Sequence, residues 1–114
     1  MTKSLDELLA MSNRELEQYA ATLQPKCLIS WNPWILDDLD DLKERFVELI
    51  NSDLGDGNVV RYIAQVRRCI EYREAVERDE DRDEAWAKAF DRPLEEIKRV
   101  QKRSAQIVAK LKSQ

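Results

Sequence analysis

The chain has 114 residues and no histidine, which removes the commonest metal ligand and the usual general base near neutral pH. Its two cysteines, Cys27 and Cys69, lie 42 positions apart. Isolated thiols of this kind are typical of reduced residues in a protein core, not of a zinc site. The sequence also lacks a glycine-rich phosphate motif and a nucleophile beside a recognisable base. We therefore expect a protein that is not an enzyme and that holds no metal and no cofactor.

Glycine and proline are also scarce, with two and three residues, so long helices are favoured over strands joined by tight turns. No run approaches the roughly 18 consecutive apolar residues of a membrane span. The segment after Met1 is polar and lacks the apolar stretch of a secretory signal. We expect a soluble, cytoplasmic protein that forms a single helical domain over residues 1–114 and makes no membrane contact.

Apolar residues recur at spacings of three and four in several segments, which predicts amphipathic helices. Ser4 and Ser12 each precede a glutamate by three residues, as in a capping box, and Asn32 followed by Pro33 is a favourable helix start. The fold predicted from these patterns is all-α, a compact bundle of four or five helices. The helices should span about 5–23 with a corner near 12, 33–51, 58–79, 83–90 and 93–112. One continuous helix over 5–23 fits nearly as well, and the run 77–84 either breaks or continues its helix.

The apolar stripes also predict which residues face the core. Leu39, Leu42 and Phe46 occupy consecutive stripe positions of the helix 33–51. The helix that begins near 58 has an apolar face wide enough to contact more than one neighbour. In the last helix, the apolar residues expected to point inward are Leu94, Ile97, Val100, Ile107, Val108 and Leu111.

Arginines and glutamates alternate in the same helix near 58–79. Arg67, Arg68 and Arg73 lie beside Glu71 and Glu74. Such a mixture is typical of a solvated helix face with weak charge pairs, so we expect no functional role for it.

Charge is divided unevenly along the chain, and this is the strongest functional signal. Residues 97–114 hold six basic and no acidic residues, while residues 1–96 carry a net charge of −10. A helix with charge of one sign attracts an oppositely charged surface. Two alternative partners have such a surface: a second copy of the chain, through its acidic segments, and the phosphate backbone of a nucleic acid.

The stretch from Trp86 to Val100 allows a helix-turn-helix, in which the last helix would present Lys98, Arg99 and Lys102 to nucleic acid. Against this, Asp91 stands where a left-handed turn usually needs glycine. Arg92 replaces an expected apolar residue, and Glu95 and Glu96 would approach the phosphates. An ordinary helical corner, with Asp91 as the cap of the last helix, is the preferred interpretation.

Trp31 and Trp34 flank Asn-Pro in an otherwise polar segment. Tryptophan favours interface hot spots and also serves as a lid on a small core. Trp34 is in phase with the helix stripe and is the better core candidate, so Trp31 is the better surface candidate.

These features together favour a small non-enzymatic helical interaction module, such as an adaptor, an assembly factor or an inhibitor, that self-associates. The alternative is a nucleic-acid-binding or regulatory protein that uses the corner at 86–100 and the basic last helix. The candidate partner-binding residues are Trp31, Trp34, Lys98, Arg99, Lys102 and Arg103.

Overall fold

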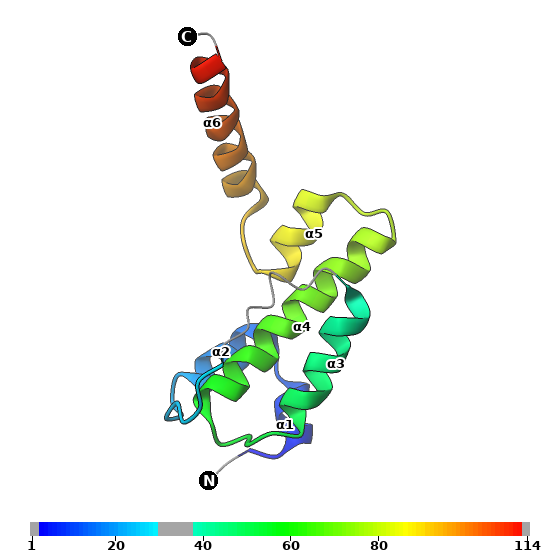
Figure 1. The fold of residues 1–114 in the computed structure, drawn as a ribbon, viewed down its shortest axis with the longest axis vertical. Helices are drawn as coiled ribbons and strands as arrows, with labels where there is room; N and C mark the ends of the chain where they lie inside the picture. The colour runs from blue at the N-terminus through cyan, green and yellow to red at the C-terminus, as the bar shows by residue number, and fades with distance from the viewer. Residues whose placement is uncertain (1–2, 30–37, 113–114) are drawn as a thin grey trace.

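The computed structural model describes residues 3–29 and 38–112, which form six α-helices and no strand (Figure 1). The helices are α1 (Leu5–Ala10), α2 (Asn13–Ala20), α3 (Leu39–Ile50), α4 (Gly57–Glu77), α5 (Arg82–Ala89) and α6 (Leu94–Lys112). The prediction of an all-α fold is confirmed. The finer prediction, a compact bundle of four or five helices, is not confirmed, because six helices are described and α6 projects from the others.

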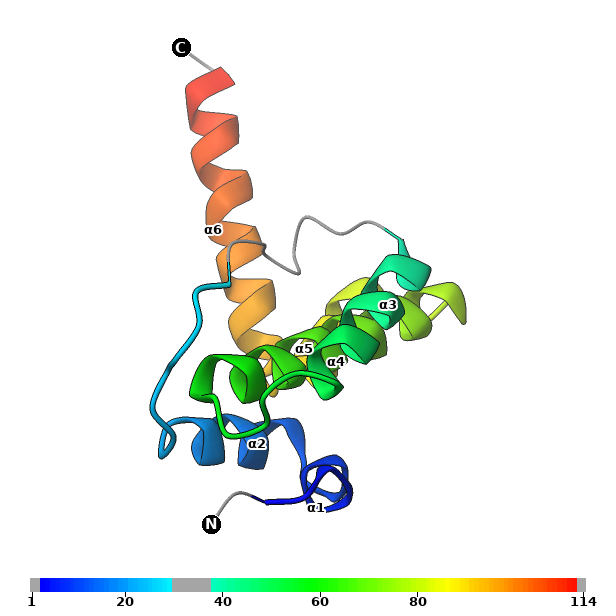
Figure 2. The ribbon, with the colours of Figure 1, turned by 60° about the horizontal axis from the view of Figure 1, so that its bottom comes forward.

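Helix α4 is the centre of the packing, because α2, α3 and α5 all lie against it (Figures 1 and 2). Only Arg61, Glu71 and Glu77 of its 21 residues are exposed. The wide apolar face of this segment therefore serves several neighbours, as its width predicts. The buried core residues that α4 shares with α1, α2 and α3 are Leu8, Leu16, Ala20, Leu49, Val59, Val60, Ile63, Ala64 and Val66.

A corner near residue 12 separates α1 from α2. Ser4 and Ser12 both form complete capping boxes with Glu7 and Glu15, so each serine side chain accepts a hydrogen bond from the glutamate amide. Met11 has an extended backbone and ends α1. The second capping box therefore starts a new helix, and the continuous helix over 5–23 is excluded.

Helix α4 begins where two loops come together. The Asp56 carboxylate is buried and accepts hydrogen bonds from the amides of Lys26, Cys27 and Asn58. A Cβ on the next residue, Gly57, would lie 2.7 Å from the Leu23 carbonyl oxygen, closer than real Cβ atoms approach. These contacts fix the segment after α2 against the start of α4.

Helix α3 starts later than its sequence predicts. The helix predicted over 33–51 is not continuous, because the extended residue Asp38 caps α3 by accepting from the Asp40 amide. Asn32 and Pro33 themselves lie outside the described residues. Within α3, Leu42 is buried and Phe46 packs against the core, while Leu39 is half-buried.

The run 77–84 breaks the helix. Asp79 has a φ of 61°, a left-handed conformation, and the Glu80 amide donates to the Ala75 carbonyl at 3.1 Å. This is the Schellman pattern that ends many helices. Asp81 then caps α5 by accepting from the amides of Asp83 and Glu84.

Helix α6 gives the molecule its elongated shape. The principal extents are 58, 30 and 24 Å, and α6 runs outward from the α5 end of the molecule (Figure 1). Its packing partner among the other described helices is α5. None of the described helices combines the length and the apolar character required to cross a membrane.

Candidate interaction surface on α6

The turn that joins α5 to α6 is a second Schellman ending. Asp91 has a φ of 52°, and the Arg92 amide donates to the Ala87 carbonyl at 2.9 Å. Asp91 is left-handed although it is not glycine, so this objection to a helix-turn-helix does not hold, and the expected role of Asp91 as cap of the last helix is wrong. Asp91 terminates α5, and Pro93 occupies the position before α6.

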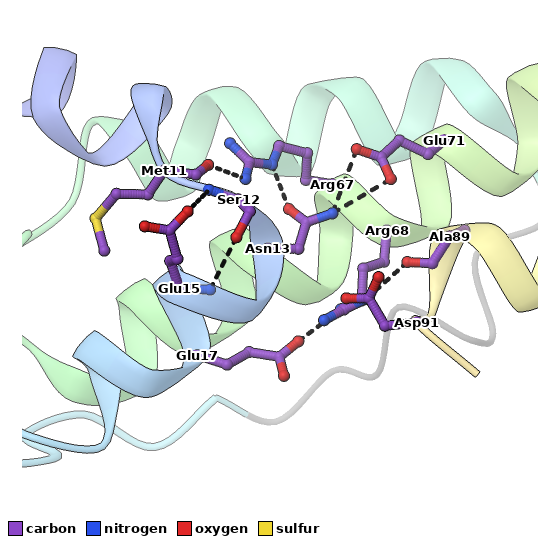
Figure 3. A network of polar contacts seen from close by, with 10 residues as sticks. All are labelled: Met11, Ser12, Asn13, Glu15, Glu17, Arg67, Arg68, Glu71, Ala89 and Asp91. Atoms are coloured by element: carbon purple, nitrogen blue, oxygen red, sulfur yellow. Dashed lines mark hydrogen bonds and ion pairs between the residues drawn. The ribbon is translucent and has the colours of Figure 1, made fainter. Parts of the chain in front are cut away.

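Arg68 holds this turn against the body of the molecule (Figure 3). Its guanidinium donates to Glu17 at 2.6 Å, to the Asp91 carboxylate at 3.0 Å and to the Ala89 carbonyl at 2.8 Å. The residue is only 5% exposed. Burial lowers the pKa of Arg68, but the hydrogen bonds and charges of Glu17 and Asp91 raise that pKa more, so the buried guanidinium remains charged. One side chain thus ties α2, α4 and the end of α5 together.

Arg67 forms a neighbouring network on the other side of α4 (Figure 3). Its guanidinium donates to the Asn13 side chain and to the Met11 carbonyl, and the Asn13 amide donates to Glu71 at 3.3 Å. These bonds satisfy polar groups at the α1–α2 corner. The prediction that Arg67 and Arg68 lie on a solvated face is therefore wrong.

The sequence does contain a signal for Arg68. Val60, Ala64 and Arg68 follow at intervals of four, so they lie along one side of α4, and all three are buried. Because basic and acidic residues are mixed in this segment, the position of Arg68 on the buried side of the helix is difficult to recognise in the sequence. The partners Glu17 and Asp91 are 51 and 23 positions away, so the chain pattern near Arg68 does not reveal them.

A cleft of about 200 Å³ lies next to Arg68, between α2, α4 and α5. Trp86 and Phe90 are stacked in its wall, with ring centroids 5.0 Å apart. Burial raises the pKa of the Cys69 thiol, also in the wall, to about 11, so little thiolate forms at neutral pH. The polar groups of Arg68 are already bonded to protein, so the cleft offers no clear ligand site. Over residues 3–29 and 38–112, no three acidic or thiol side chains come together in a way that could hold a metal ion.

Exposed apolar side chains lie close together at the C-terminal end of α6. Ile107, Val108 and Leu111 are 54, 48 and 67% exposed, although the stripe predicted that they point inward. We name these three residues the α6 apolar patch. The prediction is wrong because an amphipathic pattern shows that a helix has an apolar face, not that the same chain covers it. Exposed apolar side chains that lie close together on one helix are candidates for a binding surface.

The predicted partner-binding residues fall in different parts of the chain. Arg99, Lys102 and Arg103 are exposed on α6 and form no ion pair with the described residues. The Lys98 side chain is not among those described, and Trp31 and Trp34 lie outside the described residues. The structure therefore brings three of the six together on one helix and does not test the tryptophans.

The proposed helix-turn-helix gains no support from this corner. Phe90 stacks on Trp86 of its own helix. Beyond its first residue, the half-buried Leu94, each α6 side chain that is described is exposed. The side chains of Ile97 and Val100, which would lock the pair of helices, are not described. The motif stays a prediction.

Comparison of the chain with models of known protein families, with curated proteins and with solved structures gave no match in any of the three.

Proposed function

We propose that the chain is a single-domain, non-enzymatic helical interaction module that self-associates through α6. Roles as an adaptor, an assembly factor or an inhibitor all fit such a module. The observation that carries the proposal is the exposed α6 apolar patch at the end of a helix that projects from the body (Figure 2).

The corner supports this role because it anchors the chain just before α6. Arg68 binds both the Asp91 carboxylate and the Ala89 carbonyl, so the last turn of α5 and the residue after it are anchored to α4. A helix with an anchored base loses less freedom when it binds than a flexible tail would. The N-terminal end of α6 is thus suited to positioning the helix, and its exposed C-terminal end is suited to binding a partner.

Nucleic-acid binding is the second candidate, because Arg99, Lys102 and Arg103 are exposed and form no ion pair with the described residues. Such side chains can contact phosphates. Glu95 and Glu96 are exposed in the first turn of the same helix, and residues 1–96 carry a net charge of −10, so most of the molecule would repel a phosphate backbone. The protein partner is therefore the better-supported proposal.

Sedimentation equilibrium of the wild type and two double variants tests the proposal. Ile107→Glu with Leu111→Glu should weaken association about 100-fold, because charges would enter the buried centre of the interface. The matched control, Gln106→Glu with Ala109→Glu, adds the same charge to the same part of α6 but away from the patch. The control should change the dissociation constant by less than about threefold.

Both variants should melt at the wild-type temperature, because the altered residues are exposed. Association that is equal in all three proteins would exclude α6 as the docking element. A wild type that stays monomeric but binds duplex DNA, with affinity falling steeply as salt rises, would support the alternative.

A further inference from the structure

One series of positions along α6, four apolar and two polar, has a two-fold pattern; the apolar residues Val100 and Ile107 lie outside this series. Six positions are separated by intervals of three, four, three, four and three, which is the a/d spacing of a coiled coil. They are Leu94, Ile97, Gln101, Ser104, Val108 and Leu111. The pattern reads the same in both directions about a point between residues 102 and 103. Leucines stand at both ends, β-branched residues come next, and polar residues occupy the two central positions.

We infer that two copies of the chain pair through α6 in an antiparallel arrangement. This rests on the proposed function and names both the partner and the register. In an antiparallel pair, an a position of one helix faces a d position of the other. Position 94 then faces 111 of the second copy, 97 faces 108, and 101 faces 104. Two residues of the apolar patch, Val108 and Leu111, thus meet the beginning of the partner helix.

The projection of α6 makes room for this pairing. Figures 1 and 2 show α6 leaving the body, with its C-terminal end farthest from the other helices. A second α6 laid antiparallel would carry its own body beyond that free end. The two bodies then lie at opposite ends of the helix pair, roughly 28 Å apart along its axis, and do not collide.

The charge distribution also favours the antiparallel direction. Residues 1–93 carry a net charge of −8, and residues 94–114 carry +4. A parallel pair would bring the two acidic bodies side by side. An antiparallel pair instead places the end of α6 that carries Lys110 and Lys112 next to the acidic body of the partner. Attraction between body and helix end offsets the repulsion between two basic helices.

The two central polar positions help to fix the register. Gln101 and Ser104 occupy the a and d positions nearest to the two-fold point. If one helix were shifted along the other, polar positions would face apolar ones. A polar residue in the seam of a coiled coil specifies the register at a cost in stability. Two 19-residue helices make a contact strip about 28 Å long, which is at the small end of specific interfaces. We therefore expect a weak, reversible dimer.

A distance between two copies tests the direction of pairing. Lys112→Cys in a Cys27→Ser background provides one exposed thiol for a nitroxide label, because the remaining Cys69 is buried and its pKa is about 11. In the antiparallel register, the two labels lie roughly 30 Å apart. In a parallel pair they lie about one interhelical distance apart, roughly 10 Å plus the length of the labels. Double electron–electron resonance separates these values.

The expected result is a single distance near 30 Å that appears as concentration rises and disappears in the Ile107→Glu, Leu111→Glu variant. A short distance that the same variant abolishes would overturn the antiparallel pairing and leave the proposed function intact. A dimer that the variant does not affect would overturn both. Monomers up to about 0.5 mM would also overturn both, because self-association through α6 would then be too weak to matter.

Discussion

Helices α4 and α6 have similar lengths, 21 and 19 residues, and opposite surroundings. Helix α4 packs against α2, α3 and α5 and exposes three residues. Of the thirteen α6 residues whose side chains are described, twelve are exposed. Their composition does not explain this difference, because both carry regularly spaced apolar residues. One amphipathic helix thus organises the core of its own chain, while the other keeps apolar side chains that no described residue of the chain covers.

The largest expected effect comes from a cavity in α4. Ile63 is 1% exposed, so Ile63→Ala should lower the free energy of unfolding by about 2–5 kcal/mol. Leu111→Ala in α6 removes a similar volume from a side chain that is 67% exposed, and we expect a change below about 0.5 kcal/mol at monomer concentrations. Urea titrations followed by circular dichroism measure both. Equal losses would show that α6 packs on its own chain.

The next prediction concerns Arg68, which links α2, α4 and the end of α5. Arg68→Met should destabilise the protein by about 2 kcal/mol, because the Ala89 carbonyl and two carboxylates lose their donor. The penalty is moderate since the carboxylates of Glu17 and Asp91 are partly exposed and can be hydrated. Arg61→Met, at an exposed position of the same helix, is the control and should change stability by less than about 0.5 kcal/mol. If the two variants melted alike, the tie at Arg68 would have no energetic weight.

Acid should weaken the start of α4. Burial raises the pKa of Asp56, but hydrogen bonds from the Cys27 thiol and from backbone amides lower it more, to about 2. A carboxyl with a folded pKa below its unfolded pKa of 3.8 stabilises the protein above that value, and this contribution is lost as pH falls toward 2. We expect up to about 2 kcal/mol of stability to disappear over this interval.

Asp56→Asn should be less stable than the wild type at pH 7 and nearly equal to it at pH 2. Chemical unfolding at a series of pH values checks this prediction. A difference between the two proteins that is constant with pH would contradict the assigned role of the carboxylate.

The smallest effect concerns the two left-handed aspartates. Asp79→Gly should stabilise the protein by roughly 0.5–1 kcal/mol, because glycine adopts the left-handed conformation without strain. Asp91→Gly relieves the same strain but removes a bond to buried Arg68, so it should be neutral or destabilising. Thermal melts of the two variants should therefore move in different directions. A shared stabilisation would mean that the Arg68–Asp91 pair contributes nothing.

Local patterns in the sequence predict local structure well. The serine caps at Ser4 and Ser12 are correct because both groups of a capping box lie within four residues. Features that depend on distant residues are not predictable in this way. The role of Arg68 depends on Glu17 and Asp91, and no pattern around position 68 identifies them.

The candidate interaction surface on α6 is likewise only partly predictable from the sequence. Periodicity in α6 correctly predicts a helix and an apolar side, but it does not show whether the covering surface belongs to the same chain. The pattern therefore predicts Ile107, Val108 and Leu111 as core residues, but all three are exposed. The basic residues Arg99, Lys102 and Arg103 could be assigned to the surface, because charged side chains rarely lie in a core without partners.

Hydrogen exchange at two protein concentrations tests whether a second copy covers α6. The amides of α4 should be strongly protected at both concentrations, because its neighbours belong to the same chain. The amides of α6 should exchange quickly in dilute solution and gain protection as the protein is concentrated. Protection of α6 that equals that of α4 in dilute solution, or that does not change with concentration, would contradict the account.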